Sequence, residues 1–296
     1  MKDLQTTPIE LFASCDCRLS ESPMWNDRDG ALYWRGLDGE IFRKQMGTPP
    51  DEYQRFALGI GGIGSMVFTD TDVILLFGEN GKIWKWIPHT SPVLYKDFGG
   101  ALFNDVLCDA HGRIYCGMLA KNYFESNRGK HGSFWRLDPS GEWICIDDKI
   151  ATTPNGIRIN SQKDTLYFAI TDDDCIYAYD YDQDTGKLSN RRVFANHCCP
   201  DGIAIDQSGN LWVTDCRPSN SRLLCYAKDG KLFREWKLPV RRVISVAFGG
   251  ADRTTLFITT AHEGAPKGQY DGGVFMMKTN VIGGEEYRFP LKLSCL

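Results

Sequence analysis

The sequence predicts an all-β fold, a six-bladed β-propeller with four-stranded antiparallel blades around a central channel. A short apolar, aromatic-rich run recurs six times along the chain, and further strand-like runs flank each copy. No segment shows a convincing apolar period of 3.6 residues, so we expect helices to be scarce. The six runs begin 41, 41, 52, 45 and 45 residues apart, at 32–34, 73–77, 114–116, 166–168, 211–213 and 256–258.

Each recurring run is expected to be the second strand of a blade. A polar turn precedes it, as at 27–30 and 206–209, and β-branched or aromatic residues between such turns favour strands. The first, innermost strands are expected at 22–25, 65–68, 105–108, 156–159, 202–205 and 245–248. The third strands are expected at 41–43, 83–85, 134–136, 176–178, 224–226 and 274–276.

A fourth, outer strand follows in several repeats, as at 53–56, 93–95 and 192–194. Residues 9–12 resemble this fourth-strand pattern, so we expect the N-terminal strand to close the ring as the outer strand of the last blade. Residues 1–296 are therefore predicted to form a single domain. A β-sandwich would not require so regular a period, which is typical of propeller blades.

Composition excludes several classes of function. With 34 basic and 38 acidic residues the net charge is −4, which gives no field favouring nucleic acid or an anionic membrane. The first ten residues lack the basic start and apolar run of a signal peptide. None of the 11 cysteines forms a C-x-x-C pair, and Cys108, Cys116, Cys145 and Cys225 lie in apolar runs. We therefore expect buried thiols and a cytoplasmic location.

Polar residues recur where the first strand of each repeat begins. The six equivalent positions are Glu21, Gly64, Asn104, Asn155, Asp201 and Ile244. Innermost strands line the channel, so the four oxygen-bearing side chains are expected to converge on its axis. Two carboxylates buried together repel each other unless they are protonated or neutralised, and carboxylate and amide oxygens suit hard divalent cations. The sequence therefore predicts a metal site in the channel.

Other interpretations of these residues stay open at this point. Asn155-Gly156 and Asp201-Gly202 are also hairpin-turn dipeptides, and residues 20–23 could form a solvated turn. The G-x-G-x-x-G pattern at 59–64 leads into a predicted strand and not a helix, which argues against a dinucleotide site. No G-x-S-x-G, P-loop or H-E-x-x-H motif occurs, which argues against serine hydrolases, nucleotide triphosphatases and zincins.

Six short motifs along the chain form a recognisable set: SESPMW at 20–25, FND at 103–105, PNG at 154–156, PDGIAID at 200–206, GNLWV at 209–213 and VAFGG at 246–250. In this set the chain resembles the regucalcin/gluconolactonase (senescence marker protein-like) family of sugar lactonases. The resemblance implies one divalent metal, Ca²⁺ or Zn²⁺ with Mn²⁺ and Fe²⁺ as alternatives, held by Glu21, Asn155 and Asp201. It also implies that Asn104 contacts the substrate and that an aldonolactone is hydrolysed to the aldonic acid.

Two positions depart from the family pattern. Animal members have an arginine directly before the Phe-Asn-Asp motif, where this chain has Leu102. They also have a glutamate that contacts substrate in the following loop, and the equivalent position here is Lys121. Lys121 is therefore the candidate substrate-binding residue of that loop. Arg35, which follows the predicted second strand of the first repeat, is a candidate to supply the missing cation.

The hypothesis for the chemistry is metal-assisted hydrolysis of a small sugar lactone. A cation would polarise the carbonyl, and Asp201 would accept a proton from the attacking water as general base. Two alternatives stay open: a phosphotriesterase-like hydrolase, and a non-catalytic calcium-binding or protein-interaction propeller. The sequence indicates no particular oligomeric state.

Overall fold

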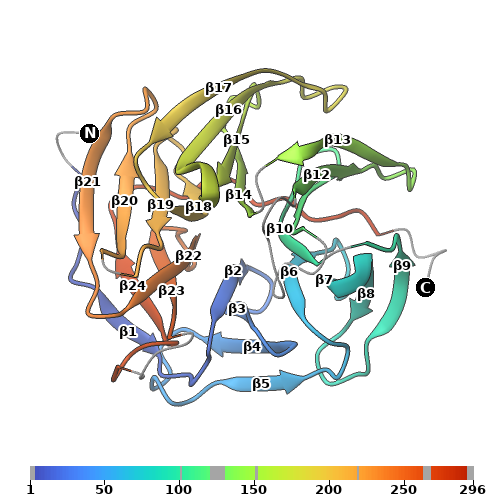
Figure 1. The fold of residues 1–296 in the computed structure, drawn as a ribbon. Helices are drawn as coiled ribbons and strands as arrows, with labels where there is room; N and C mark the ends of the chain where they lie inside the picture. Colours follow the sequence, from blue (N-terminus) through green and yellow to red (C-terminus); the bar gives the residue numbers. More distant parts are fainter. Residues whose placement is uncertain are drawn as a thin grey trace.

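The computed structural model describes residues 4–100, 102–120, 131–150, 153–218, 220–262 and 268–291. The strands form six four-stranded antiparallel sheets arranged as blades around a central axis (Figure 1), which confirms the predicted fold class. Within these residues the only helical segments are two 3₁₀ turns, Glu79–Gly81 and Thr171–Asp173. Neither described helical segment has the length or apolar character needed to span a bilayer.

The first five blades follow the chain in order. The first consists of β2 (Ser20–Asn26), β3 (Ala31–Gly36), β4 (Glu40–Gln45) and β5 (Gln54–Ala57). The second consists of β6 (Ile63–Phe68), β7 (Ile74–Gly78), β8 (Lys82–Trp86) and β9 (Val93–Asp97). The third consists of β10 (Phe103–Cys108), β11 (Ile114–Met118), β12 (Gly132–Leu137) and β13 (Trp143–Ile150). The fourth consists of β14 (Pro154–Ile159), β15 (Thr165–Ile170), β16 (Cys175–Tyr181) and β17 (Leu188–Asn196). The fifth consists of β18 (Pro200–Ile205), β19 (Leu211–Asp215), β20 (Arg222–Tyr226) and β21 (Leu232–Lys237).

The sixth blade combines both ends of the chain. Its inner strands are β22 (Arg242–Gly249), β23 (Thr255–Ala261) and β24 (Val274–Lys278), and β1 (Glu10–Ala13) is its outer strand. β1 pairs antiparallel with β24, with Leu11 opposite Phe275. The buried Phe12 packs edge-on against Phe257 of the sixth blade, at 4.9 Å between ring centroids, and shares a core cluster with Trp34 of the first blade. Phe12 therefore fastens the last blade to the first.

The segment after β24 crosses the far end of the channel. Gly283 bridges to Asp206 of the fifth blade, and Phe289 bridges to Thr69 of the second. Glu286 and Tyr287 from this segment line a cavity of about 30 Å³ in the channel, together with Asp105 and other inner-strand residues. A cavity of that size holds about one water molecule. The C-terminal segment therefore closes the channel on this side.

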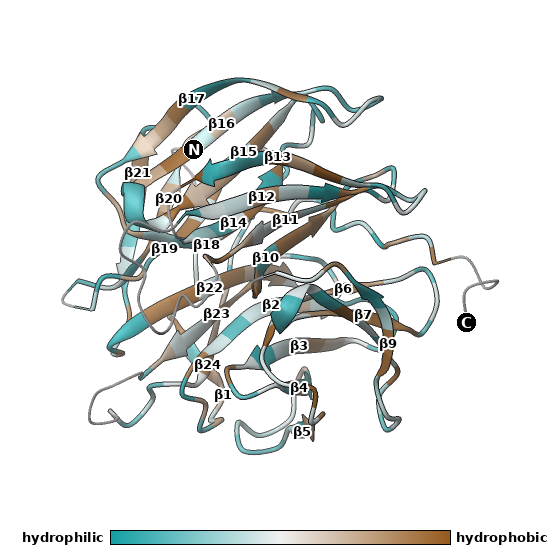
Figure 2. Cartoon of the chain, turned by 45° about the vertical axis from the view of Figure 1, so that its right-hand side comes forward, coloured by the Kyte–Doolittle hydropathy of each residue, from teal (hydrophilic) through white to brown (hydrophobic). Residues whose placement is uncertain are grey.

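The hydrophobic core lies between neighbouring blades, where the inner strands are almost entirely buried. Figure 2 shows hydrophobic residues along inner strands such as β10 and β22 and hydrophilic residues in the connecting loops. Cys108, Cys116 and Cys225 are buried, as expected. The expectation for Cys145 is wrong, because its side chain is exposed. Cys145 lies on β13, the outermost strand of its blade, which packs against a neighbouring strand along one edge only.

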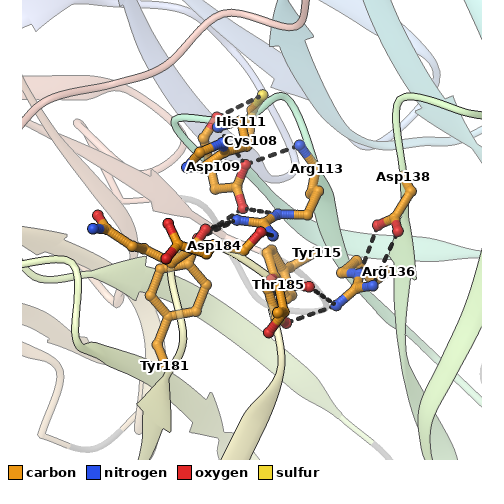
Figure 3. Close-up of polar contacts among 12 residues, drawn as sticks. Cys108, Asp109, His111, Arg113, Tyr115, Arg136, Asp138, Tyr181, Asp184 and Thr185 are labelled. Carbon is orange, nitrogen blue, oxygen red and sulfur yellow. Dashed lines mark hydrogen bonds and ion pairs between the residues drawn. The ribbon is translucent and has the colours of Figure 1, made fainter.

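A buried polar network joins the third and fourth blades (Figure 3). Arg113 donates from Nε to Oδ2 of Asp109 at 2.6 Å, and the hydroxyl of Tyr181 donates to the same oxygen at 2.8 Å. Arg113 also donates to the backbone carbonyl of Asp184 at 3.1 Å, in the loop between β16 and β17. Asp109 and Arg113 are 1% and 5% exposed. Each buried charge in this network thus has a partner, and the attraction and hydrogen bonds between the partners offset the cost of desolvation.

Candidate functional site

A β-bulge interrupts the pairing of the first and second strands in all six blades. The register shifts between Glu21 and Met24, Ile63 and Ser65, Phe103 and Val106, Pro154 and Ile157, Pro200 and Ile203, and Val243 and Ser245. The six equivalent positions identified in the sequence therefore lie at or inside these bulges. A bulge re-aims a side chain away from the regular pleat, which explains why polar residues are placed here on otherwise apolar strands.

Close contact between inner strands explains the glycines of two motifs. A Cβ on Gly156 would lie 2.6 Å from the backbone nitrogen of Ile203, and a Cβ on Gly202 would lie 2.6 Å from the Cα of Ser245. Both glycines lie within β14 and β18, so neither dipeptide forms the hairpin turn considered above. Residues 20–23 are likewise buried in β2, and the solvated-turn interpretation is wrong.

Asn104 and Asn155 lie in direct contact at this end of the channel. The Nδ2 of Asn104 donates to the carbonyl of Pro154 at 2.8 Å and to Oδ1 of Asn155. The Nδ2 of Asn155 donates to Thr171 Oγ1 at 2.6 Å, and Thr171 in turn donates to the carbonyl of Pro200 at 2.7 Å. This chain of bonds connects the third, fourth and fifth blades and holds the amide of Asn155 in one orientation.

Asp201 is buried, and its Oδ1 has no hydrogen-bond partner among the described residues. Burial raises the pKa of this carboxyl well above its usual range, and the neighbouring Cys216 and Asp105 raise it further. The positive charges of Arg242 and Arg35 act in the opposite direction on this pKa.

Glu21 and Arg35 form a buried ion pair on adjacent strands of the first blade. They are directly opposite in the β2–β3 register, where side chains of an antiparallel pair are close neighbours. The Nη2 of Arg35 contacts Oε2 of Glu21, and the two side chains are only 4% and 6% exposed. The Nε of Arg35 donates to the carbonyl of Gly64 at 2.9 Å. Arg35 thus lies inside β3 and not after it, with its guanidinium buried between the first two blades.

Glu21, Asn155 and Asp201 offer two carboxylates and one amide, each from the innermost strand of a different blade. Oxygen donors of this kind suit a hard divalent cation, and the unpartnered Oδ1 of Asp201 is a free ligand atom. The donor set therefore fits such an ion. In the described part of the chain, no three His, Cys, Asp or Glu side chains gather as a metal site would need. Binding of an ion at this place would therefore require the amide oxygen of Asn155 as a ligand in addition to the carboxylates. Lys121 lies outside the described residues.

Two features of this site could not be predicted from the sequence. Nothing in a single repeat signals the bulges, although the glycines after Asn155 and Asp201 reflect the close strand contact beside them. The pairing of Arg35 with Glu21 depends on the β2–β3 register, which a local pattern does not define.

Comparison with known proteins places these features in a family. Residues 19–262 match the family model described as "SMP-30/Gluconolactonase/LRE-like region". The chain is 27% identical to pentonolactonase of Haloferax volcanii over 292 residues, which cover 94% of this chain and 97% of the relative. It is 27% identical to regucalcin of Gallus gallus over 271 residues, which cover 88% of this chain and 89% of the relative.

Solved structures show the same fold. A luciferin-regenerating enzyme superposes with a TM-score of 0.84 at 21% identity, over 96% of this chain and 99% of the other. The calcium-binding protein regucalcin of Agrobacterium tumefaciens superposes with a TM-score of 0.84 at 19% identity, over 95% and 97% of the two chains. The matched region 19–262 includes every one of the six equivalent channel positions. This chain therefore belongs to the SMP-30/Gluconolactonase/LRE-like family.

Proposed function

We propose that this protein hydrolyses a sugar lactone with the help of one divalent cation held by Glu21, Asn155 and Asp201. The observation that carries the proposal is the buried Oδ1 of Asp201, which has no partner among the described residues and lies at the bulge in the inner strand of the fifth blade. A buried acceptor with no partner is costly, and a cation or a water proton would satisfy it. The names of two relatives, a pentonolactonase and a gluconolactonase of Xanthomonas campestris, support a lactone as substrate.

Asp201 is proposed as the general base. Burial raises the pKa of the Asp201 carboxyl, and a nearby positive charge lowers it and favours the ionised form that a general base needs. Cation chemistry at such a place consists of polarising a lactone carbonyl and making a water more acidic. Asp201 would then take the proton of the attacking water on its carboxylate and return it to the ring oxygen as the lactone C–O bond breaks.

Asn104 and Lys121 are proposed to bind the sugar. Both N–H groups of the Asn104 amide are already donated, to Pro154 and Asn155. Its remaining polar atom is Oδ1, so Asn104 would accept a hydrogen bond from a sugar hydroxyl. Lys121, which follows β11 in the sequence, would supply a donor to a substrate oxygen.

The test is a lactonase assay on protein stripped of metal with a chelator. Ca²⁺, Zn²⁺, Mn²⁺ and Fe²⁺ are restored one at a time, against a panel of five- and six-carbon aldonolactones and, in parallel, a phosphotriester. We expect the stripped protein to be inactive and one ion to restore lactone hydrolysis. Asp201→Asn should lower kcat by about 10²- to 10⁴-fold, the usual range for loss of a general base.

Asp174→Asn is the matched control, because Asp174 is an exposed aspartate that pairs with Arg217. It should keep the wild-type kcat. Full hydrolysis in the presence of chelator, or by Asp201→Asn, would contradict the proposal. Metal binding without turnover of any lactone would instead favour a non-catalytic calcium-binding propeller, and turnover of the phosphotriester alone would favour a phosphotriesterase-like hydrolase.

A further inference from the structure

The ion pair between Arg35 and Glu21 places a permanent positive charge directly beside Glu21, a proposed metal ligand. Arginine stays protonated in proteins, so its charge cannot be lost by titration. Its guanidinium is held from two sides, by Oε2 of Glu21 in the first blade and by the carbonyl of Gly64 in the second. The side chains of Arg35 and Glu21 are 4% and 6% exposed, so dissolved salt screens the pair only weakly.

The channel position of the second blade carries no side chain. It is Gly64, where a Cβ would lie 1.7 Å from the carbonyl oxygen of Phe103. The backbone carbonyl of Gly64 accepts the hydrogen bond from Arg35. Arg35 comes from the neighbouring strand β3 and brings its guanidinium to this place, where its charge also acts on the carboxyls of Asp105 and Asp201.

Charge balance shows what the arginine does to a divalent ion. Ionised Glu21 and Asp201 together carry two negative charges, which a divalent cation would neutralise. With Arg35 paired to Glu21, only one net negative charge remains for the ion. Binding would then either leave an excess positive charge in a buried channel, which is costly, or require Arg35 to leave Glu21.

We propose that Arg35 is an internal cation that competes with the divalent metal for Glu21 and so weakens metal binding. This inference rests on the proposed metal site. The arginine acts through Glu21, as a positioning residue. The apparent affinity for the metal is the intrinsic affinity multiplied by the fraction of molecules in which Glu21 is free to bind it. In the metal-free protein the same pair stabilises the buried carboxylate.

Calorimetric titration of Ca²⁺ or Mn²⁺ into chelator-treated protein tests the proposal. Arg35→Met should tighten the dissociation constant by about tenfold or more, because a buried carboxylate without its partner gains most from a new cation. Arg35→Lys keeps the charge and should bind the metal with nearly wild-type affinity. A merely structural role of Arg35 would not tighten metal binding when the side chain is removed.

Arg43→Met is the matched control. Arg43 also lies in the first blade and pairs with a carboxylate, Asp29, at 3.0 Å, but it belongs to the half-buried outer part of the blade. This variant should leave the metal affinity unchanged. If Arg35→Met fails to fold, Arg35→Gln, which retains a donor for the Gly64 carbonyl, is titrated in its place.

The outcomes separate this inference from the proposed function. Equal or weaker binding by the Arg35 variant, with metal-dependent lactonase activity in the wild type, overturns the inference alone. Tight binding by the variant together with no binding by the wild type supports the inference and contradicts the metal dependence of the wild-type protein. Absence of binding in both proteins overturns both.

Discussion

At the scale of single residues, the site combines atoms that are satisfied with one that is not. The amide of Asn155 is held by Asn104 and Thr171, and Glu21 is held by Arg35. Asp201 Oδ1 has no such partner within the described chain. Buried polar atoms are nearly always paired. Asp201 Oδ1 is one of seven unpaired buried side-chain atoms among the described residues, and it is the one that lies at a channel position, which indicates where a ligand would act.

A residue-scale prediction concerns Gly156, which allows β14 and β18 to approach. Gly156→Ala would push a methyl group against the Ile203 nitrogen and the Asp201 carbonyl, at 2.6 and 2.7 Å. We expect the free energy of unfolding to fall by about 1–3 kcal/mol, as overpacking usually does, with loss of lactonase activity because Asp201 is displaced. Urea denaturation measures the first effect and the aldonolactone assay the second.

Gly62→Ala is the control for this substitution. The nearest atoms to a Cβ on Gly62 are 3.8 and 4.0 Å away, which is ordinary contact, and its backbone needs no left-handed conformation. Its stability should stay close to that of the wild type. If Gly156→Ala were as stable and active as Gly62→Ala, the close approach of the strands would not constrain the site.

At the scale of elements, neighbouring blades are joined by polar contacts as well as by apolar packing. The Asp109–Arg113 pair belongs to the third blade and receives Tyr181 from the fourth. Asp109→Ala would leave a buried arginine without its partner, so we expect a loss of about 3–5 kcal/mol in the free energy of unfolding. Chemical denaturation followed by tryptophan fluorescence measures this change.

Asp180→Ala provides the comparison for an exposed pair. Asp180 bonds to Arg192 at 2.6 Å, but both side chains are about half exposed, at 52% and 43%. Pairs in such surroundings contribute little, so the free energy of unfolding should hardly change. Similar losses for the two variants would mean that burial of the network in Figure 3 adds nothing to stability.

Sequence patterns predict the inner strands of the blades better than the outer strands. The inner strands were predicted within a few residues, because burial on both faces leaves continuous apolar runs. The outer strands β13 and β21 have no such pattern, and Leu232–Lys237 is largely exposed. A strand whose side chains mostly face water forms mainly because its backbone pairs with the neighbouring strand. The local sequence alone does not predict this pairing.

At the scale of the whole molecule, the ring depends on one short strand. β1 joins the sixth blade, and Phe12 packs between that blade and the first. Phe12→Ala would open a cavity at the closure of the ring, and we expect it to cost about 3–5 kcal/mol in the free energy of unfolding. Thermal and urea unfolding measure this, and the loss should exceed that of Val93→Ala.

Val93 is the control because it is 61% exposed on the outer strand β9. Truncating it removes little buried surface, so its variant should unfold close to the wild type. Equal stability of the two variants would show that the ring stays closed without the packing of Phe12. The same closure keeps the first and sixth blades adjacent, and with them the channel positions of Glu21 and Ile244.

The number of blades, the order of their strands and the oxygen-rich set of channel residues could be predicted from the amino-acid sequence alone. These follow from periodicity and composition, which each repeat carries locally. The folded structure was needed to show that the channel positions lie at bulges, that Asp201 has an oxygen without a partner among the described residues, and that Arg35 lies opposite Glu21. The physical reason is that bulges, burial and register arise from contacts between strands, and residues in contact across strands or blades are distant in the sequence.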